Sequence, residues 1–83
     1  MITARQTRAA RALLGWTQEM LADKAKVSLT ALKRMESAIG MRVFESTSDQ
    51  IRRALEAEGI VFINSGRNEG VMIVDGQESA KRG

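Results

Sequence analysis

The first half of the chain carries apolar residues spaced three and four positions apart, in three short segments separated by polar breaks. This spacing places the apolar side chains of each segment on one helical face. The pattern predicts helices over residues 4–14, 18–25 and 29–37. Their inward faces are Thr7, Ala10, Arg11 and Leu14 in the first, Leu21, Ala22 and Ala25 in the second, and Leu32 and Met35 in the third.

Capping residues mark the ends of these helices. Thr3 and Gln6 have the spacing of a capping box, in which each side chain bonds the backbone N–H of the other residue. Thr17 and Ser28 suit the N-caps of the second and third helices, and Gly15 suits a left-handed position after the first. Because only two residues separate the second helix from the cap of the third, the two helices must cross steeply, as in a helix-turn-helix.

The second half of the chain has a different pattern. Residues 47–50 form another capping box and predict a helix over residues 48–58 that Gly59 ends, whereas the stretch 41–47 gives no clear prediction. Two apolar runs, Ile60–Ile63 and Val71–Val74, flank a polar loop over residues 64–70 and predict a β-hairpin. We therefore expect one folded unit in residues 1–58, a hairpin in residues 59–75 that belongs to the same unit, and a flexible tail in residues 76–83.

Composition narrows the possible functions. The 83 residues include no cysteine and no histidine, which removes disulfides, thiolate and imidazole chemistry and the usual zinc ligands. We expect no catalytic residues, no metal and no cofactor. No stretch approaches the ~20 apolar residues of a membrane span, and the N-terminus lacks the apolar core of a signal peptide, so we expect a cytoplasmic protein without a membrane partner.

The net charge of +3 is unevenly distributed. Residues 1–36 hold seven basic and three acidic side chains, against six basic and seven acidic ones in residues 37–83. A basic surface on one part of a molecule suits phosphate binding, because each neutralised phosphate releases counterions. A solvated helical surface explains the charge alone equally well.

The segment from Gln18 to Ser37, QEMLADKAKVSLTALKRMES, resembles the helix-turn-helix of the phage-repressor and Cro family, also called the XRE family. The matching positions are Gln18, Ala22, Val27, Ser28, Leu32 and Glu36, and residues 5–17 are similar to the preceding helix of the family. Lys26 departs from the glycine usual in the turn, and Thr7 replaces a larger aliphatic residue. The resemblance implies a repressor-like helix-turn-helix domain of four to five helices, and with the apolar runs the expected fold is mainly α with a C-terminal β-hairpin.

The resemblance also implies roles in binding double-stranded DNA. The helix that begins at Ser28 and runs to about Glu36 would enter the major groove. The expected base contacts are Leu29, Thr30, Lys33 and Arg34, and the expected phosphate contacts are Gln18, Ser28, Lys26, Arg5 and Arg8. Arg34 is the strongest base-contact prediction, because a guanidinium can bond guanine O6 and N7 together. For Arg5 and Arg8 a solvated surface is an equally good interpretation. Arg11 and Glu36 stand where family members form a structural ion pair.

The hairpin predicts a homodimer. Its two runs are apolar throughout, so both faces of the ribbon need cover, and a chain this small covers one. The expected interface residues are Ile60, Phe62, Val71 and Ile73. A two-fold dimer would place two recognition helices about 34 Å apart on an inverted repeat. The alternative is a hairpin covered within one chain by the helix at 48–58 and the stretch 41–47.

These observations favour a DNA-binding transcription regulator. The alternative is a protein-binding module of the antitoxin or antiactivator kind that uses the same fold. The basic N-terminal half favours DNA.

Overall fold

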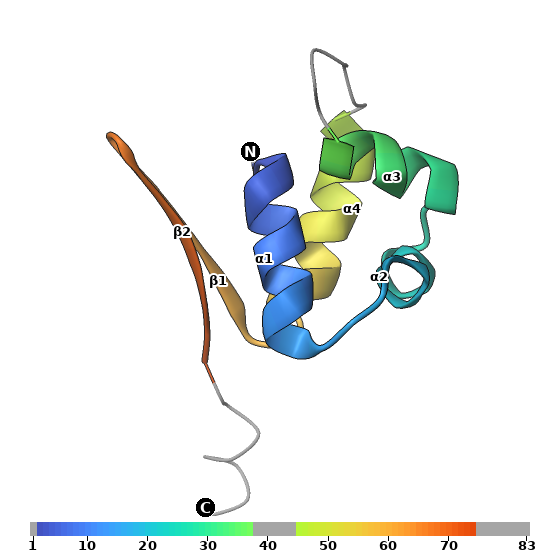
Figure 1. The fold of residues 1–83 in the computed structure, drawn as a ribbon, viewed down its shortest axis with the longest axis horizontal. Helices are drawn as coiled ribbons and strands as arrows, with labels where there is room; N and C mark the ends of the chain where they lie inside the picture. The colour runs from blue at the N-terminus through green and yellow to red at the C-terminus, as the bar shows by residue number, and fades with distance from the viewer. Residues whose placement is uncertain (1, 38–44, 75–83) are drawn as a thin grey trace, which may run out of the picture.

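The computed structural model describes residues 2–37 and 45–74. Four helices are followed by a two-stranded antiparallel hairpin, which confirms the predicted fold class (Figure 1). The elements are α1 Ala4–Leu14, α2 Gln18–Ala25, α3 Leu29–Ser37, α4 Glu45–Glu56, β1 Ile60–Ser65 and β2 Asn68–Ile73. The first three helices have the predicted bounds.

The predicted caps are present at the starts of these helices. The Thr3 hydroxyl accepts a hydrogen bond from the backbone N–H of Gln6, and the Gln6 side chain accepts one from the backbone N–H of Thr3, completing the capping box. Thr17 caps α2 in the same way, by accepting from the N–H of Met20 at 3.1 Å. Each cap satisfies backbone donors that the first turn of a helix leaves unpaired.

The turns between the helices use left-handed backbone. Gly15 ends α1 at φ 69°, where glycine carries no steric cost. Lys26 ends α2 at φ 59° and is the one non-glycine residue with positive φ among the residues described. A side chain in this conformation costs about 1 kcal/mol. The helix-turn-helix therefore keeps its turn geometry without the usual glycine.

The core lies between α1, α2, α3 and α4. Its largest fully buried aliphatic side chains are Leu21, Leu32, Ile51, Leu55 and Ile60. Small residues Ala10, Ala22 and Ala25 are also buried, which allows the short helices to approach closely. No helix in the described part of the chain has the length and apolar character to cross a membrane.

The fourth helix differs from its prediction at both ends. It already includes Glu45, three residues before the predicted start, and its last helical residue is Glu56 rather than residue 58. Ser48 lies inside the helix and is buried on the same face as Ile51 and Leu55. The buried stripe therefore extends one turn further than the capping box suggested. Predictions for residues 38–44 and 75–83, the tail among them, fall outside the described residues.

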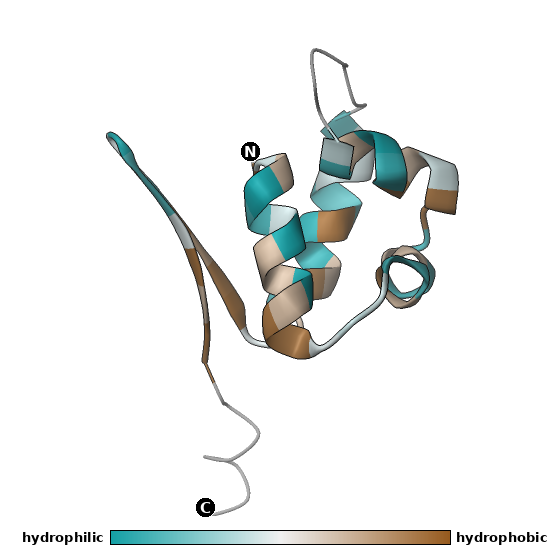
Figure 2. Cartoon of the chain, in the orientation of Figure 1, coloured by the Kyte–Doolittle hydropathy of each residue, from teal (hydrophilic) through white to brown (hydrophobic). Residues whose placement is uncertain are grey.

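The hairpin is longer than predicted, and the seven-residue loop was wrong. The ladder continues through Asn64↔Glu69 to Ser65↔Asn68, which leaves a two-residue turn, Gly66 and Arg67. Gly66 has φ 60° at the first position of this turn, where two-residue hairpin turns of type II′ place glycine. Polar residues thus extend the ribbon beyond its apolar part, as Figure 2 shows at the tip.

The two faces of the hairpin have different surroundings, which corrects the predicted interface. Ile60 is 2% exposed in the core of its own chain, and Phe62 and Val71 pack partly buried against that core. Ile73 pairs with Ile60 but is 43% exposed. Strand side chains alternate between faces and paired residues share a face, so all four residues expected at a dimer interface lie on the face turned toward α1, and Ile73 is the exposed one among them. α1 and α4 provide this cover.

Candidate nucleic-acid interface

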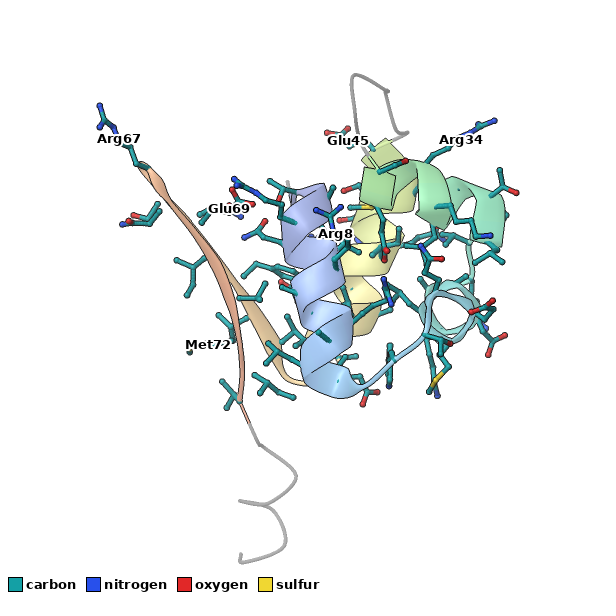
Figure 3. All side chains as sticks on the ribbon, in the orientation of Figure 1. Arg8, Arg34, Glu45, Arg67, Glu69 and Met72 are labelled. Atoms are coloured by element: carbon teal, nitrogen blue, oxygen red, sulfur yellow. The ribbon has the colours of Figure 1, made fainter. Side chains whose placement is uncertain are left out.

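The exposed face of α3 carries three of the four predicted base contacts. Thr30, Lys33 and Arg34 are exposed, while Leu32, Met35 and Glu36 on the opposite face are buried. The helical period separates the two sets, because positions 30, 33 and 34 lie on one side of a helix and 32, 35 and 36 on the other. Arg34 extends away from the rest of the molecule (Figure 3).

Leu29, the fourth predicted base contact, is half-buried and packs against the core. Its side chain therefore contributes to holding the start of α3, and only part of it faces solvent. The exposed surface of α3 is more polar than the sequence suggested.

The start of α3 is fixed by its own cap. The Ser28 hydroxyl oxygen accepts a hydrogen bond from the backbone N–H of Ala31 at 3.0 Å, and Ser28 is exposed. A hydroxyl whose oxygen accepts the capping hydrogen bond can still donate its own O–H to another acceptor. Lys26 lies two residues earlier and is also exposed. The turn and the start of α3 thus offer a hydroxyl donor and an ammonium group to an anion.

The cations of this surface have no ion-pair partner in the part of the chain that the structure describes. Within residues 2–37 and 45–74, no carboxylate forms an ion pair with Lys26, Lys33 or Arg34. Glu36 is the one acidic residue between Lys24 and Ser37, and it is buried. The field outside α3 is therefore positive.

Glu36 is held by a network that joins α3 to α1 and α2. Arg11 donates to both carboxylate oxygens, from Nε at 2.6 Å and from Nη2 at 2.7 Å, and donates to the Trp16 carbonyl oxygen at 3.1 Å. The hydrogen bonds to Glu36 raise the pKa of Arg11, and burial partly opposes this rise. The Glu36 side chain is 4% exposed, so its negative charge is stabilised by the Arg11 guanidinium and hardly at all by water.

Gln18 belongs to the same network. Its amide Nε2 donates to Glu36 Oε1 at 3.1 Å. From the sequence we expected this amide to contact a phosphate. In the structure one of its N–H groups is bound to Glu36, which leaves the second N–H and the backbone N–H groups at the start of α2 for an anion.

Arg5 and Arg8, the other two predicted phosphate contacts, bond to different parts of the fold. Arg8 donates to the backbone carbonyl of Glu36 near the C-terminal end of α3, where a cation is favourable. Arg5 pairs with Glu69 of β2 at 2.5 Å, and its side chain is 77% exposed. Hydrogen bonds from Thr3 and Arg5 lower the pKa of Glu69. Arg5 therefore lies beside the hairpin, apart from the cations around α3, whereas Arg8 lies against the C-terminal end of α3.

A residue that sequence reasoning missed joins α1 to the hairpin. Gln6 is 2% exposed, and its Nε2 donates to the carbonyl oxygens of Ile63 at 3.1 Å and Gly70 at 2.9 Å. Its Oε1 accepts from the backbone N–H of Thr3 at 3.0 Å. The signal that could have indicated more than a cap is its place beside Thr7 and Ala10 on the inward side of α1.

The comparison with known families matches this geometry. Residues 8–41 match the sequence model of the helix-turn-helix family, which spans most of α1, all of α2 and α3 and the residues that follow. No curated protein matches the chain. The matched segment includes α2 and α3 with their caps, the tight turn at Lys26 and the Arg11–Glu36 ion pair. Residues 8–41 therefore belong to the helix-turn-helix family of DNA-binding transcription regulators of the XRE type.

Proposed function

We propose that this chain is a sequence-specific regulator that inserts α3 into the major groove of double-stranded DNA. One observation carries the proposal. The exposed side of α3 and its preceding turn present Lys26, Lys33 and Arg34, which pair with no carboxylate among the described residues, whereas Glu36 is buried in an ion pair. A phosphate backbone that approaches α3 would meet positive charge and no exposed carboxylate of that helix.

Each side chain on this surface has a distinct expected role. Arg34 would bond guanine O6 and N7 together, and Thr30 would contact a neighbouring base edge or a thymine methyl group. Lys26 and Lys33 would neutralise phosphates and add affinity that does not depend on sequence. The Ser28 hydroxyl and the N-terminal N–H groups of α2, next to Gln18, would hold phosphate oxygens and set the register.

A second copy of the chain would complete the binding unit. A single helix in one major groove provides few contacts, and a two-fold pair would read two half-sites in inverted orientation. The competing proposal is a module that binds a protein through the same surface. The absence of an exposed carboxylate on the described part of α3 favours the DNA proposal, because its cations then have phosphate as their simplest complement.

The test is a binding-site selection from a randomised duplex pool, followed by affinity measurements on the selected fragment. Arg34→Ala should cost about 1–3 kcal/mol and relax the preference at one base position, whereas Lys33→Ala should weaken all sequences evenly. Arg53→Ala provides a matched control, because it removes the same charge from an exposed site on α4.

The affinity should also fall steeply as the salt concentration rises, since phosphate neutralisation releases counterions. An Arg34→Ala variant with an unchanged base preference would remove Arg34 from the reading role. No binding to any duplex at low salt would favour the protein-binding module instead.

A further inference from the structure

A groove runs between α1 and β2. Its volume is about 440 Å³, and its lining includes residues of both elements and of the hairpin turn: Arg5, Gln6, Ala9, Arg67, Glu69 and Val71. Ligand sites in proteins commonly have volumes of roughly 300–1,000 Å³. The proposed DNA binding does not use this groove, because it places the duplex against α3 and the turn that precedes it.

The end of the groove beside the hairpin turn carries an excess of positive charge. Arg5 and Arg67 supply two guanidinium groups there and Glu69 supplies one carboxylate, which leaves one positive charge in excess. Arg5 Nη2 donates to Glu69 Oε1 at 2.5 Å, yet the Arg5 side chain remains 77% exposed. Arg67 forms no ion pair with any carboxylate of residues 2–37 and 45–74. A single added negative charge would therefore neutralise this end of the groove.

Arg67 is placed to reach an anion at this end. Figure 3 shows Arg67 at the tip of the hairpin and Glu69 between the hairpin and α1. Arg67 is exposed, so its side chain changes rotamer rapidly and can turn over the end of the groove without a movement of the backbone. Its guanidinium then offers a fork of N–H donors, which matches the two oxygens of a carboxylate.

Away from the turn the groove becomes apolar. Gln6 bonds the carbonyl oxygen of Gly70, and Ala9 and Val71 line the groove at the positions that follow along α1 and β2. Both of these apolar residues are half-buried. The helix and the strand thus run side by side in the same direction, and each changes from charged to apolar along its length.

Two exposed apolar residues continue the apolar part. Leu13 lies one turn after Ala9 on roughly the same side of α1, and Ile73 lies on the same face of β2 as Val71. Leu13 is 46% exposed and Ile73 is 43% exposed, although Ile73 is on the hairpin face that is turned toward α1. The described part of the chain therefore leaves this end of the face partly open. Along α1, the distance from Arg5 to Leu13 is about 12 Å.

We propose that this groove binds a small amphipathic carboxylate. The carboxylate head bonds Arg5 and Arg67, and the apolar chain lies along Ala9 and Val71. The order of chemistry along the groove is the order along such a molecule. A carboxylate supplies the one negative charge that the head end lacks, whereas a phosphate monoester carries nearly two near neutral pH and leaves an excess. A neutral lipid leaves the guanidinium groups without a counter-charge, and a nucleic acid has no apolar chain for the other end.

The site is independent of the proposed DNA binding. On α1, Arg5 and Gln6 contact the hairpin, whereas Arg8 and Arg11 contact α3. A helix turns about 100° per residue, so these two contact faces lie roughly 140° apart around α1. The groove and the exposed side of α3 are therefore on different parts of the molecule, and the ligand is tested without DNA.

The experiment is a titration of the isotope-labelled full-length chain, followed by two-dimensional amide NMR. The probes are decanoate, decanol and acetate, each kept below the concentration at which it forms micelles. We expect saturable binding of decanoate, with the largest shifts at Ala9, Gly70 and Val71. Decanoate should bind at least about fivefold more tightly than decanol or acetate, since each of these lacks either the charge or the chain.

Arg67→Gln tests the contact with the head. It should lower the affinity for decanoate by about fivefold and leave the affinity for decanol unchanged, because only decanoate carries the charge. Arg53→Gln is the matched control, since it makes the same change at an exposed site on α4 and should leave both affinities unchanged. The amide spectra also show whether each variant is folded.

Leu13→Gln tests the far end of the groove. It should weaken decanoate and leave the shorter hexanoate unaffected, because only the longer chain extends to Leu13. Met20→Gln is the matched control, since Met20 is similarly exposed, at 43%, but belongs to α2.

Three results would overturn the proposed ligand site. The first is the absence of saturable shifts at the groove. The second is decanol binding as tightly as decanoate. The third is equal shifts at Val61 and Met72, on the exposed opposite face of the hairpin, because these would show adsorption to any apolar surface. None of these results bears on the proposed function, since the titrations contain no DNA.

Discussion

The two sides of α1 are joined to the rest of the molecule by different chemistry. Toward α3 the contact is a buried ion pair, with Glu36 4% exposed and Arg11 20% exposed. Toward the hairpin it is the neutral amide of Gln6, supported by the exposed pair of Arg5 and Glu69. An unpaired buried charge costs more than an unpaired amide or carbonyl, so we expect the α3 side to respond more strongly to the loss of one partner.

The largest expected effect is on the α3 side. Glu36→Gln keeps the side-chain volume but leaves the partly buried guanidinium of Arg11 without its counter-charge, and should lower the free energy of unfolding by about 3 kcal/mol. Urea denaturation measures this loss. Glu56→Gln is the control, since it removes a carboxylate from an exposed pair with Arg52 and should cost less than about 1 kcal/mol. Equal losses in the two variants would show that burial does not strengthen the Arg11–Glu36 contact.

A smaller effect is expected on the hairpin side. Gln6→Leu leaves the Ile63 and Gly70 carbonyl oxygens without their side-chain donor, and should cost about 2 kcal/mol. Amide hydrogen exchange should show protection lost first in β1 and β2 and kept in α2 and α3. The exposed Gln50 of α4 provides the matched control, Gln50→Leu. Uniform loss of protection along the chain would mean that the two sides of α1 unfold together.

The smallest effect is a gain that leaves both contacts of α1 intact. Lys26→Gly relieves a side chain at φ 59° and should raise the free energy of unfolding by about 0.5–1 kcal/mol. Lys24→Gly, two residues earlier in helical backbone, should instead lower it by about 1 kcal/mol. Thermal unfolding compares the two variants. A loss at both positions would show that Lys26 stabilises the turn through its side chain.

The same difference in chemistry explains which parts of the fold the sequence predicted. The bounds of α1, α2 and α3 follow from caps such as Thr3, Thr17 and Ser28, which bond backbone groups three residues away. Local signals of this kind can be recognised in a single sequence, without knowledge of long-range contacts. The Arg11–Glu36 pair came from the family resemblance rather than from spacing, because the two residues are 25 positions apart.

The errors concern long-range contacts. Asn64 and Glu69 look like loop residues, but Gln6 and Arg5 of α1 bond them and the ladder continues through them. Nothing near position 64 in the sequence indicates a partner 58 positions earlier. For the same reason the sequence does not show which face of the hairpin its own chain covers: both runs are apolar, so only the placement of α1 distinguishes the two faces.

The spacing of these contacts along the chain also has a consequence for the order of folding. The hydrogen bonds around Glu36 join residues 18 to 28 positions apart, whereas those between α1 and the hairpin span 57 to 66 positions. Closing a longer loop costs more chain entropy, and the hairpin is synthesised after the four helices. On the ribosome, α1, α2 and α3 emerge before the strands that dock on α1. We therefore expect a nascent chain to fold α1, α2 and α3 first and the hairpin afterwards. Because α1 is then already folded when the hairpin emerges, the apolar strands can pack against it with little delay.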